Sequence, residues 1–366
     1  MTRCLNELDR FRTRSLIFLT RKAPESVSSS RRLLINGRFL TLHITGMERY
    51  GREIYRRLPP NRVQAITPKR PLYGLAGYVW EQTYLPRKIA WDDILWSPAS
   101  SGPLLVPNQI LTIHDLSVFD HPEWFSTRVR LTYAALLPRL ARNVRHIVTD
   151  SAFSRDRILE RFVVPPDRVS VIYPGVTAPL DQLSPHNATS NVSCDYVAAY
   201  GGSDPRKNVT RLVRAWRAVA SELPDIRLKV FGQTSPVFSS TQQITDTDRI
   251  DNLGYLTDPQ LMDLYRGTRA FVYPSLYEGF GLSPLEAISH GVPVVLSDIP
   301  VFREVFGNAA RYVDPYDEDS IADGILDVLT NHPLRQTLAQ AAKDLPSRYT
   351  WEGAAASLLT IAEECG

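Results

Sequence analysis

The sequence is poor in the features that mark secreted, membrane-spanning and metal-binding proteins. Its 366 residues include three cysteines, which are scattered without pairing or metal-ligand spacing and so fit a reducing compartment. No apolar run approaches the roughly 20 residues that a membrane-spanning helix needs. The apolar run near residue 15 is too short for the core of a signal peptide. We therefore expect a cytoplasmic protein, and we predict neither a metal nor another cofactor.

The length of the chain exceeds what one hydrophobic core usually serves, so two domains are expected. Short apolar runs alternate with helical patterns from Leu33 onward, which predicts parallel sheets covered by helices on both faces. Strands are expected at 94–97, 110–114, 146–149, 169–172, 196–200, 226–231, 250–253, 270–273 and 292–296, in addition to the one that begins at Leu33.

A polar, proline-bearing segment divides the chain and predicts a linker. The expected organisation is a loose basic tail at 1–31, an N-terminal Rossmann-like domain at 32–176, the linker at 177–194, a C-terminal Rossmann-like domain at 195–346 and a C-terminal helix at 347–366.

Charge is unevenly divided along the chain. Residues 1–176 carry 27 lysines and arginines against 15 aspartates and glutamates, whereas residues 177–366 carry 15 and 24. The basic half indicates either an anionic partner, such as phosphorylated lipid or a membrane surface, or solvated arginines without a partner. Peripheral contact with the cytoplasmic membrane face therefore stays open. The basic residues form no recognised nucleic-acid-binding motif, so no nucleic-acid partner is predicted.

The stretch YPSLYEGFGLSPLE at 273–286 is typical of an anion-binding turn. An apolar run at 269–273 predicts a buried strand before it, and a helix is expected from about Ser283. The glycines let a ligand approach the backbone, and the helix N-terminus directs unpaired N–H groups at that ligand. Glu278 and Glu286 flank the turn and suit ribose and sugar hydroxyls, so the motif predicts a nucleotide-sugar site. The alternative is that both glutamates cap or pair with helix ends.

The stretch YGGSDPRKN at 200–208 predicts a contact with phosphate. It follows a predicted strand and places Arg206 and Lys207 after two glycines and before a helix. Arginine can bind two phosphate oxygens at once, while lysine supplies a point charge, and a diphosphate suits both. The alternative is an ordinary surface loop in which Asn208 caps the next helix.

Both motifs, in this order, resemble those of the retaining glycosyltransferases of family 4. The GY at Gly254–Tyr255 is similar to the base-contacting turn of that family, and HGVPVVLSDIPVFREVFGNAARYVDP at 290–315 matches its usual continuation. INGRFLTLHITGMERYGREI at 35–54 looks like bacterial members that build O-antigens and exopolysaccharides, often with mannose or rhamnose. The resemblance implies the α/β GT-B fold, in which two Rossmann-like, doubly wound domains face each other across a cleft. It also implies a C-terminal helix that returns to the N-terminal domain.

The resemblance implies a role for each motif. Arg206 and Lys207 would hold the donor diphosphate and stabilise it as it leaves. Glu286 would bind the ribose hydroxyls, and Glu278 the transferred sugar or its phosphate. His114, at a predicted strand end, would lie near that sugar. The other expected donor-binding positions are turn glycines and the amides beside them, at Gly46, Gly202, Gly254, Gly279, Phe280, Gly281 and Leu282.

Other polar and aromatic residues have simpler interpretations. His114 could instead be a strand-end histidine bonded to backbone, with Asp115 as a turn residue. Ser151 and Ser154 are expected to cap the helix that follows them. Three further residues could line an acceptor site, but buried packing is the favoured interpretation for them: Trp80, Glu81 and Tyr84.

The resemblance implies transfer of a hexose from a nucleotide-sugar donor, with GDP-mannose favoured, to a hydroxyl of a saccharide or lipid-linked saccharide in polysaccharide or O-antigen biosynthesis. It implies anomeric retention without a carboxylate nucleophile: the acceptor hydroxyl attacks from the leaving-group face and a phosphate oxygen takes its proton. The alternatives are a GT-B epimerase or phosphorylase, and a non-catalytic subunit that binds nucleotide sugars.

Overall fold

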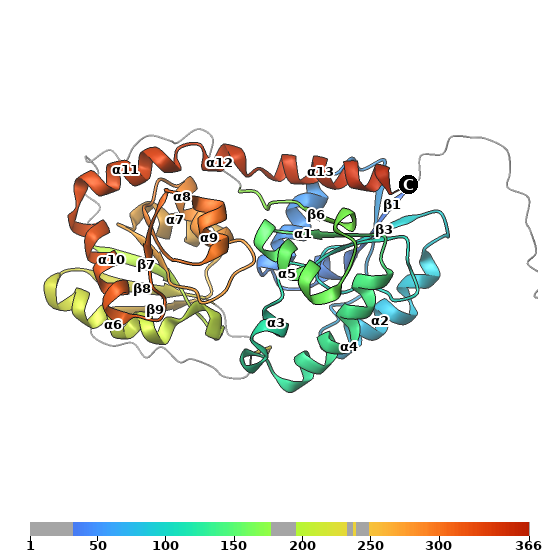
Figure 1. The fold of residues 1–366 in the computed structure, drawn as a ribbon, viewed down its shortest axis with the longest axis horizontal. Coiled ribbons are helices and arrows are strands. Elements are labelled where there is room, and N and C mark those ends of the chain that lie inside the picture. The colour runs from blue at the N-terminus through green and yellow to red at the C-terminus, as the bar shows by residue number, and fades with distance from the viewer. Residues whose placement is uncertain (1–31, 177–194, 233–236, 239–248, 366) are drawn as a thin grey trace, which may run out of the picture. The chain divides into compact units, whose positions relative to one another are not determined.

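The computed structural model describes residues 32–176, 195–232, 237–238 and 249–365. The described residues form two six-stranded sheets in which every neighbouring pair of strands is parallel. In Figure 1 the strands of the first sheet run from blue to green, and those of the second from yellow to orange. This is the pair of Rossmann-like domains that the α/β pattern predicts. The expected tail at 1–31 and linker at 177–194 lie outside the described residues.

The first sheet has the order β2-β1-β3-β4-β5-β6 and the second the order β12-β11-β10-β7-β8-β9. The strands are β1 (Leu33–Asn36), β2 (Val63–Ile66), β3 (Ile94–Ser97), β4 (Gln109–Thr112), β5 (His146–Thr149), β6 (Val169–Val171), β7 (Tyr196–Tyr200), β8 (Arg227–Phe231), β9 (Ile250–Gly254), β10 (Phe271–Tyr273), β11 (Val294–Ser297) and β12 (Ala310–Val313). The α-helices are α1 (Gly46–Arg57), α2 (Gly74–Thr83), α3 (Ser117–Asp120), α4 (Thr127–Asn143), α5 (Ala152–Phe162), α6 (Val209–Glu222), α7 (Asp258–Gly267), α8 (Leu282–Ser289), α9 (Pro300–Phe306), α10 (Glu318–Thr330), α11 (His332–Ala342), α12 (Leu345–Arg348) and α13 (Trp351–Glu364). Within the described part of the chain, no helix is both long and apolar enough to cross a membrane.

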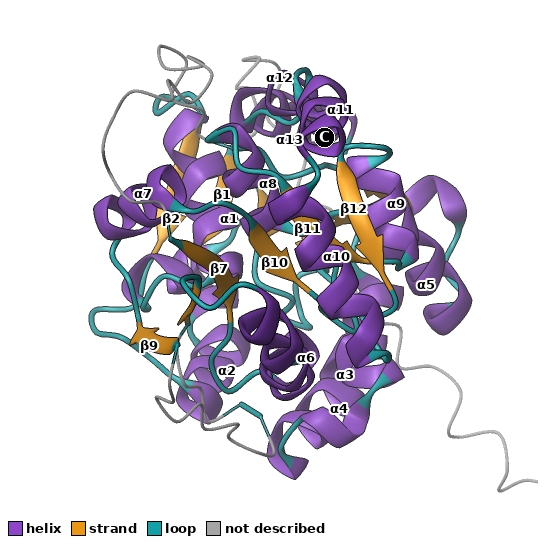
Figure 2. Ribbon diagram, turned by 90° about the vertical axis from the view of Figure 1, so that its left-hand side faces the viewer, coloured by secondary structure: helices purple, strands orange, loops and turns teal. Residues whose placement is uncertain are grey.

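Both faces of each sheet are buried beneath helices. In β1, Leu33 and Ile35 pack with α1 and α13, while Leu34 packs on the other face with Leu85. In the second sheet, β10 directs Phe271 toward α7, α8 and α9 and Val272 toward α6 and α10. Figure 2 shows helices on both sides of these strands. Strands buried on both faces are near-continuous apolar runs, which is why most of them can be found in the sequence.

The predictions missed β2 and β12, each at one edge of its sheet, but found the other two edge strands, β6 and β9. In β2 every residue is at least partly exposed, and Gln64 interrupts its apolar pattern. In β12 the middle residues, Arg311 and Tyr312, are partly exposed. An edge strand has one neighbour and an open side, so its sequence carries a weaker apolar signal than a central strand.

The C-terminal helix returns to the N-terminal domain, as predicted. The end of the N-terminal domain at 175–176 lies beside the segment 349–350 that precedes α13. The Val176 amide donates to the Tyr349 carbonyl there at 3.0 Å. A Cβ on Gly175 would lie 2.1 Å from the Trp351 backbone nitrogen, so glycine lets the two segments run in contact. Trp351 is buried among residues of β1 and β3, and α13 lies along α1 (Figure 1).

Candidate active site

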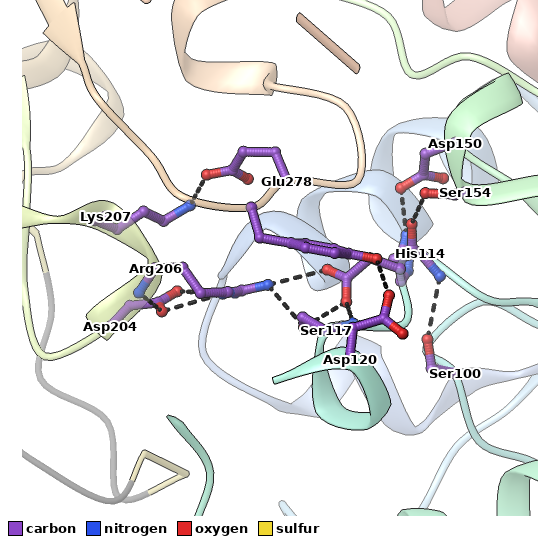
Figure 3. A network of polar contacts seen from close by, with 12 residues as sticks. Ser100, His114, Ser117, Asp120, Asp150, Ser154, Asp204, Arg206, Lys207 and Glu278 are labelled. Atoms are coloured by element: carbon purple, nitrogen blue, oxygen red, sulfur yellow. Dashed lines mark hydrogen bonds and ion pairs between the residues drawn. The ribbon is translucent and has the colours of Figure 1, made fainter. Parts of the chain in front are cut away.

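The ends of β7 and β10 bring the two predicted motifs of the C-terminal domain together. These strands are neighbours in the sheet, and the carboxyl ends of parallel strands share one edge. After β7 the chain turns at Gly202, whose φ of +89° favours glycine, and then forms the 3-10 turn η5 (Pro205–Lys207). Lys207 Nζ donates to Glu278 Oε1 at 2.6 Å (Figure 3). It also donates to the Tyr273 hydroxyl at 2.6 Å. Lys207 and Glu278, which the sequence names in separate roles, are therefore in direct contact.

The Lys207–Glu278 ion pair is buried, since each residue is 8% exposed. The ammonium also lies 5.5 Å from the centroid of the Tyr200 ring and 4.9 Å from that of Tyr273, within the range of a cation–π interaction. Burial and then the Glu278 carboxylate raise the pKa of Tyr273 well above its ordinary value. Tyr273 is therefore a neutral hydroxyl that accepts the hydrogen bond from Lys207.

Arg206 links the second sheet to the end of β4 in the first. Its Nε and Nη2 donate to the Asp204 carboxylate at 2.8–3.1 Å. Its Nη1 donates to Asp115 Oδ2 at 3.0 Å. The same nitrogen donates to Ser117 Oγ at 3.2 Å (Figure 3). Burial alone would raise the pKa of Asp115, but Arg206 and the hydrogen bonds from Ser117 lower it below its ordinary value. Asp115 is thus both a turn residue, which accepts from the Ser117 amide, and an anionic partner of Arg206.

The turn before α8 has the geometry of an anion cradle. Gly281 is the N-cap of α8 with φ of +104°, and Pro284 lies in the first turn of the helix, as predicted. The backbone amides at 279–283 donate to no acceptor among the described residues. A Cβ on Gly279 would lie 2.5 Å from the His114 carbonyl oxygen, so the turn touches the end of β4. Free amides at a helix N-terminus bind phosphate or another anion.

The side chains of Phe280 and Leu282 belong to the core, so only their backbone can contribute to this cradle. Phe280 is 4% exposed and packs edge-on against Tyr349 at a centroid distance of 5.4 Å. Leu282 is partly buried against residues of both domains. The expected donor contacts at these two positions are therefore contacts of amide groups.

Glu286 projects from α8 and meets an arginine of the N-terminal domain. Arg49 Nη1, on α1, donates to Glu286 Oε1 at 2.8 Å, and its Nη2 donates to the Asp258 carboxylate at the start of α7. Burial raises the pKa of Glu286 to about 7, although Arg49 acts in the opposite direction. Gly46 begins α1, and Gly254 ends β9 just before α7 with φ of +62°. Arg49 therefore joins α1, which begins at Gly46, to Glu286 on α8 and to the start of α7.

His114 lies just beyond the end of β4 with both ring nitrogens bonded. Nδ1 lies 2.7 Å from Asp150 Oδ2 (Figure 3). Nε2 lies 2.8 Å from the Pro98 carbonyl oxygen. Burial disfavours the charged ring, but Asp150 and Pro98 favour it, and together they raise the pKa of His114 above its ordinary value. The ring is thus bonded to backbone, as the simpler interpretation expects, and it also belongs to a buried pair with Asp150. Contact with the transferred sugar stays a prediction.

The remaining polar candidates have structural contacts. Ser151 caps α5 by accepting from the Ser154 amide at 3.1 Å, as predicted, whereas the Ser154 hydroxyl donates to the His114 carbonyl. Asn208 precedes α6 but its side chain does not cap it; the amide group donates instead to the carbonyls of Pro274 and Pro315. Asn208 thus occupies the N-cap position of α6, as that alternative expects, but its side chain ties three loops together and makes no capping hydrogen bond.

Of the residues considered for an acceptor site, Glu81 is buried and Trp80 partly buried, as expected, whereas buried packing is wrong for Tyr84, which is 42% exposed. Trp80 and Tyr84 stack on each other at a centroid distance of 5.9 Å. Glu81 is 1% exposed and accepts hydrogen bonds from Asn36, Arg38 and Ser101.

Two residues at the site were missed from the sequence. Arg49 is one of four arginines on α1, and nothing in its neighbours separates it from the others. Asp204 lies within the 200–208 motif, which predicts no role for it, yet its carboxylate holds Arg206 in place. A carboxylate two residues before a predicted phosphate-binding arginine is a signal that could have been used.

The described residues that could ligate a metal form no metal centre. Among the described residues, no group of three or more histidines, cysteines and carboxylates is placed to hold a metal ion. The spacing D-x-D does occur at 246–248, outside the described residues, and at 317–319. In the second triplet Asp317 caps α10 by accepting from the Asp319 amide. Independence from metal remains a prediction.

Comparison with known proteins places the chain among glycosyltransferases. Residues 189–345 match the family model for glycosyl transferases group 1, and residues 91–178 match that for glycosyltransferase family 4. The chain is 33% identical to the O-antigen chain mannosyltransferase B of Escherichia coli, over 73% of this chain and 74% of that protein. It is also 33% identical to the O-antigen chain mannosyltransferase RfbU of Salmonella typhimurium (strain LT2), over 74% and 75%.

Solved structures share the fold. WaaG, a glycosyltransferase involved in lipopolysaccharide biosynthesis, aligns over 90% of this chain and 99% of its own with a TM-score of 0.67 and 16% identity. TarM aligns over 79% of this chain with a TM-score of 0.57 and 20% identity, and the alignment spans 58% of the TarM chain.

Proposed function

The chain belongs to the glycosyltransferases of family 4, and from that premise we propose that it moves a hexose from a nucleotide sugar to a hydroxyl of a saccharide or lipid-linked saccharide with retention of anomeric configuration. Mannose from GDP-mannose is the proposed donor sugar, because two relatives at 33% identity are O-antigen chain mannosyltransferases. The same relatives support a place in O-antigen or related polysaccharide synthesis.

One observation carries the proposal. The cations Arg206 and Lys207, the Glu278 carboxylate and the free amides at 279–283 meet at one sheet edge. A nucleotide sugar combines an anionic diphosphate with sugar hydroxyls, and this edge offers cations and amides for the first and a carboxylate for the second.

The proposed mechanism depends on charge at the leaving group. As the bond from the anomeric carbon to the β-phosphate breaks, negative charge builds on the diphosphate and positive charge on the sugar ring. Arg206, Lys207 and the N-terminus of α8 stabilise the first, since fixed donors aimed at developing charge supply a large catalytic effect. The Asp115 carboxylate accepts from Arg206 Nη1, and a phosphate oxygen of the donor could accept from the same guanidinium. On donor binding, we expect the diphosphate to take over that contact.

Retention follows in this scheme from attack on the same face. The acceptor hydroxyl bonds to the anomeric carbon on the side from which the diphosphate leaves, and a phosphate oxygen accepts the hydroxyl proton. Glu278 is held by Lys207 as a binding group for the sugar and does not act as a nucleophile. No bound metal is part of the scheme.

We further propose that the N-terminal domain contacts an anionic membrane surface, where a lipid-linked acceptor would be found. Tyr73, Leu75 and Val79, on and beside α2, are more than half exposed. Exposed basic residues lie on both flanks of α2 in the sequence, at Lys69, Arg70, Arg87 and Lys88. Apolar side chains beside basic ones suit the interface of an anionic bilayer. Sedimentation with phosphatidylglycerol vesicles but not with phosphatidylcholine vesicles is the expected result, and equal sedimentation with both would contradict it.

The test of function has two steps. A thermal-shift panel of GDP-, UDP-, dTDP- and ADP-sugars identifies the donor, because a ligand that binds the native state raises its apparent stability. The selected donor is then incubated with saccharide acceptors, and the anomeric configuration of the product is read by NMR. Product formed without added acceptor would indicate an epimerase or phosphorylase. Binding without turnover on any acceptor would indicate a non-catalytic subunit, and inverted product would exclude the retaining mechanism.

A further inference from the structure

Arg49 connects the two domains at the residue expected to bind ribose. Its guanidinium reaches from α1 to α8 and α7, where it bonds the carboxylates of Glu286 and Asp258. The side chain of Arg49 is 28% exposed and that of Glu286 is 16% exposed, so the contact is partly shielded from water. Shielding strengthens an ion pair relative to one on the open surface.

The position of Arg49 is set by the packing of its own helix. A capping box between Thr45 and Glu48 fixes the start of α1. The next residue after Arg49, Tyr50, is 2% exposed and packs edge-on against His114 and Trp351. Because α1 cannot rotate without exposing Tyr50, Arg49 is directed at the second domain.

One of the two carboxylate oxygens of Glu286 accepts a hydrogen bond from the described residues. Arg49 bonds Oε1, and no described residue donates to Oε2. Three ionisable side chains face the group: Arg49 from α1, and Asp258 and Tyr265 from α7. Burial and Asp258 raise the pKa of Glu286, to about 7, while Arg49 opposes them. Without Arg49, Glu286 would be a buried carboxylate beside a second carboxylate, and its neutral form would be favoured.

We propose that Arg49 is a positioning residue that holds Glu286 charged and oriented, so that its second oxygen accepts hydrogen bonds from the ribose of the donor. The inference rests on the proposed function, because it needs a nucleotide to bind at Glu286. It adds a requirement for the N-terminal domain in recognising the nucleotide: ribose is read by a carboxylate of one domain whose charged form an arginine of the other domain favours and orients.

The experiment compares ribose with deoxyribose. Dissociation constants of GDP and 2′-deoxy-GDP are measured by calorimetry at several pH values for the wild type, Arg49→Gln and Arg56→Gln. Arg56 is a matched control, since it lies on the same helix and pairs with Glu53 within it. The ratio of the two constants cancels the titration of the phosphates, which both ligands share, and leaves the contribution of the 2′-hydroxyl. UDP with 2′-deoxy-UDP, or ADP with 2′-deoxy-ADP, replaces the pair if the wild type prefers that base.

In the wild type we expect a preference for the ribose form that weakens as the pH falls through about 7, where Glu286 takes up a proton. In Arg49→Gln the midpoint moves to higher pH because the stabilising cation is gone. Near neutral pH, binding of GDP weakens roughly tenfold or more, the range for losing a hydrogen bond to a charged group. Arg56→Gln keeps both the affinity and the ratio of the wild type.

The possible outcomes separate the two proposals. A wild type that binds none of these nucleotides rejects the proposed function. A wild type that prefers ribose, with an unchanged affinity, ratio and midpoint in Arg49→Gln, rejects the role of Arg49 and leaves the function standing. Should Arg49→Gln fail to fold, Arg49→Lys is measured in its place, since it keeps the cation but not the two-pronged contact. In that variant the midpoint stays near the wild-type value because the cation remains; a weaker preference for ribose supports the inference, and a wild-type preference overturns it.

Discussion

The buried contact between Lys207 and Glu278 allows structure and chemistry to be separated by mutation. Lys207→Met removes the cation but keeps a side chain of similar length, so Glu278 is left as a buried carboxylate without its partner. Breaking a buried pair in this way costs about 3–5 kcal/mol. Lys207→Met combined with Glu278→Gln leaves two neutral groups, and such replacements are often nearly neutral for stability. We therefore expect the double variant to be more stable than the single one.

The catalytic effect should follow a different order. Lys207 is proposed to stabilise charge on the leaving diphosphate, and removing one such donor costs about 10²–10³ in kcat. The second substitution restores no cation, so it should recover stability without recovering turnover. A gain of stability with no gain of activity is the expected signature of a residue with both roles.

Urea unfolding followed by circular dichroism measures the first effect. With a slope of about 3 kcal/mol/M, a loss of about 3 kcal/mol moves the midpoint down by about 1 M. Lys343→Met, which changes an exposed lysine of the same domain, controls for the loss of one positive charge. Unfolding of Lys207→Met at the midpoint of the wild type would refute the reasoning on the buried pair. Turnover restored in the double variant would refute the catalytic role.

Four further predictions follow from single features. Arg206→Ala should lower kcat by about 10²–10³ for lack of a charge-stabilising donor, and near-normal turnover would reject that role. Gly279→Ala should destabilise the protein by about 1–3 kcal/mol, measured by thermal unfolding, because its Cβ would lie 2.5 Å from the His114 carbonyl. Dialysis against EDTA should leave turnover unchanged, and activity that returned only with a divalent metal would contradict the metal-free scheme. The raised pKa of His114 stabilises the folded protein fully at pH values below the pKa of histidine in the unfolded chain, and this stabilisation is lost as the pH rises through the pKa in the folded protein. His114→Asn should therefore flatten that part of a curve of unfolding free energy against pH.

The sequence predicts the central strands of both sheets because burial leaves a strong pattern there. The run that contains Phe271 and Val272 is apolar throughout, since the two faces of β10 are covered by different helices. The same reasoning fails for β2, whose residues are all partly exposed. Burial is therefore the main signal in the pattern, although the pattern also finds β9, in which Ile250 is the one buried residue.

The C-terminal half of the site is predictable for a related reason. A phosphate-binding turn needs glycine where φ is positive, and Gly202 and Gly281 meet that need beside charged residues. These local requirements are written in consecutive residues. The contact between Lys207 and Glu278 is not, because it depends on β7 and β10 being neighbours in the sheet. Sequence reasoning could name both residues without seeing that each is the partner of the other.

Contacts between domains are the hardest to foresee, and Arg49 illustrates why. Four arginines lie on α1, and three of them bond acceptors other than Glu286 and Asp258. Arg52 bonds carbonyls of the segment before the helix, and Arg56 bonds Glu53 on the helix itself. Arg57 bonds Glu53 and also Glu352 on α13. Only the orientation of α1, fixed by Tyr50 in the core, turns Arg49 toward Glu286 and Asp258. That orientation depends on packing between elements far apart in the sequence. A basic N-terminal half is therefore a sum of residues with unrelated tasks, and net charge alone could not reveal that one of them reaches the proposed donor site.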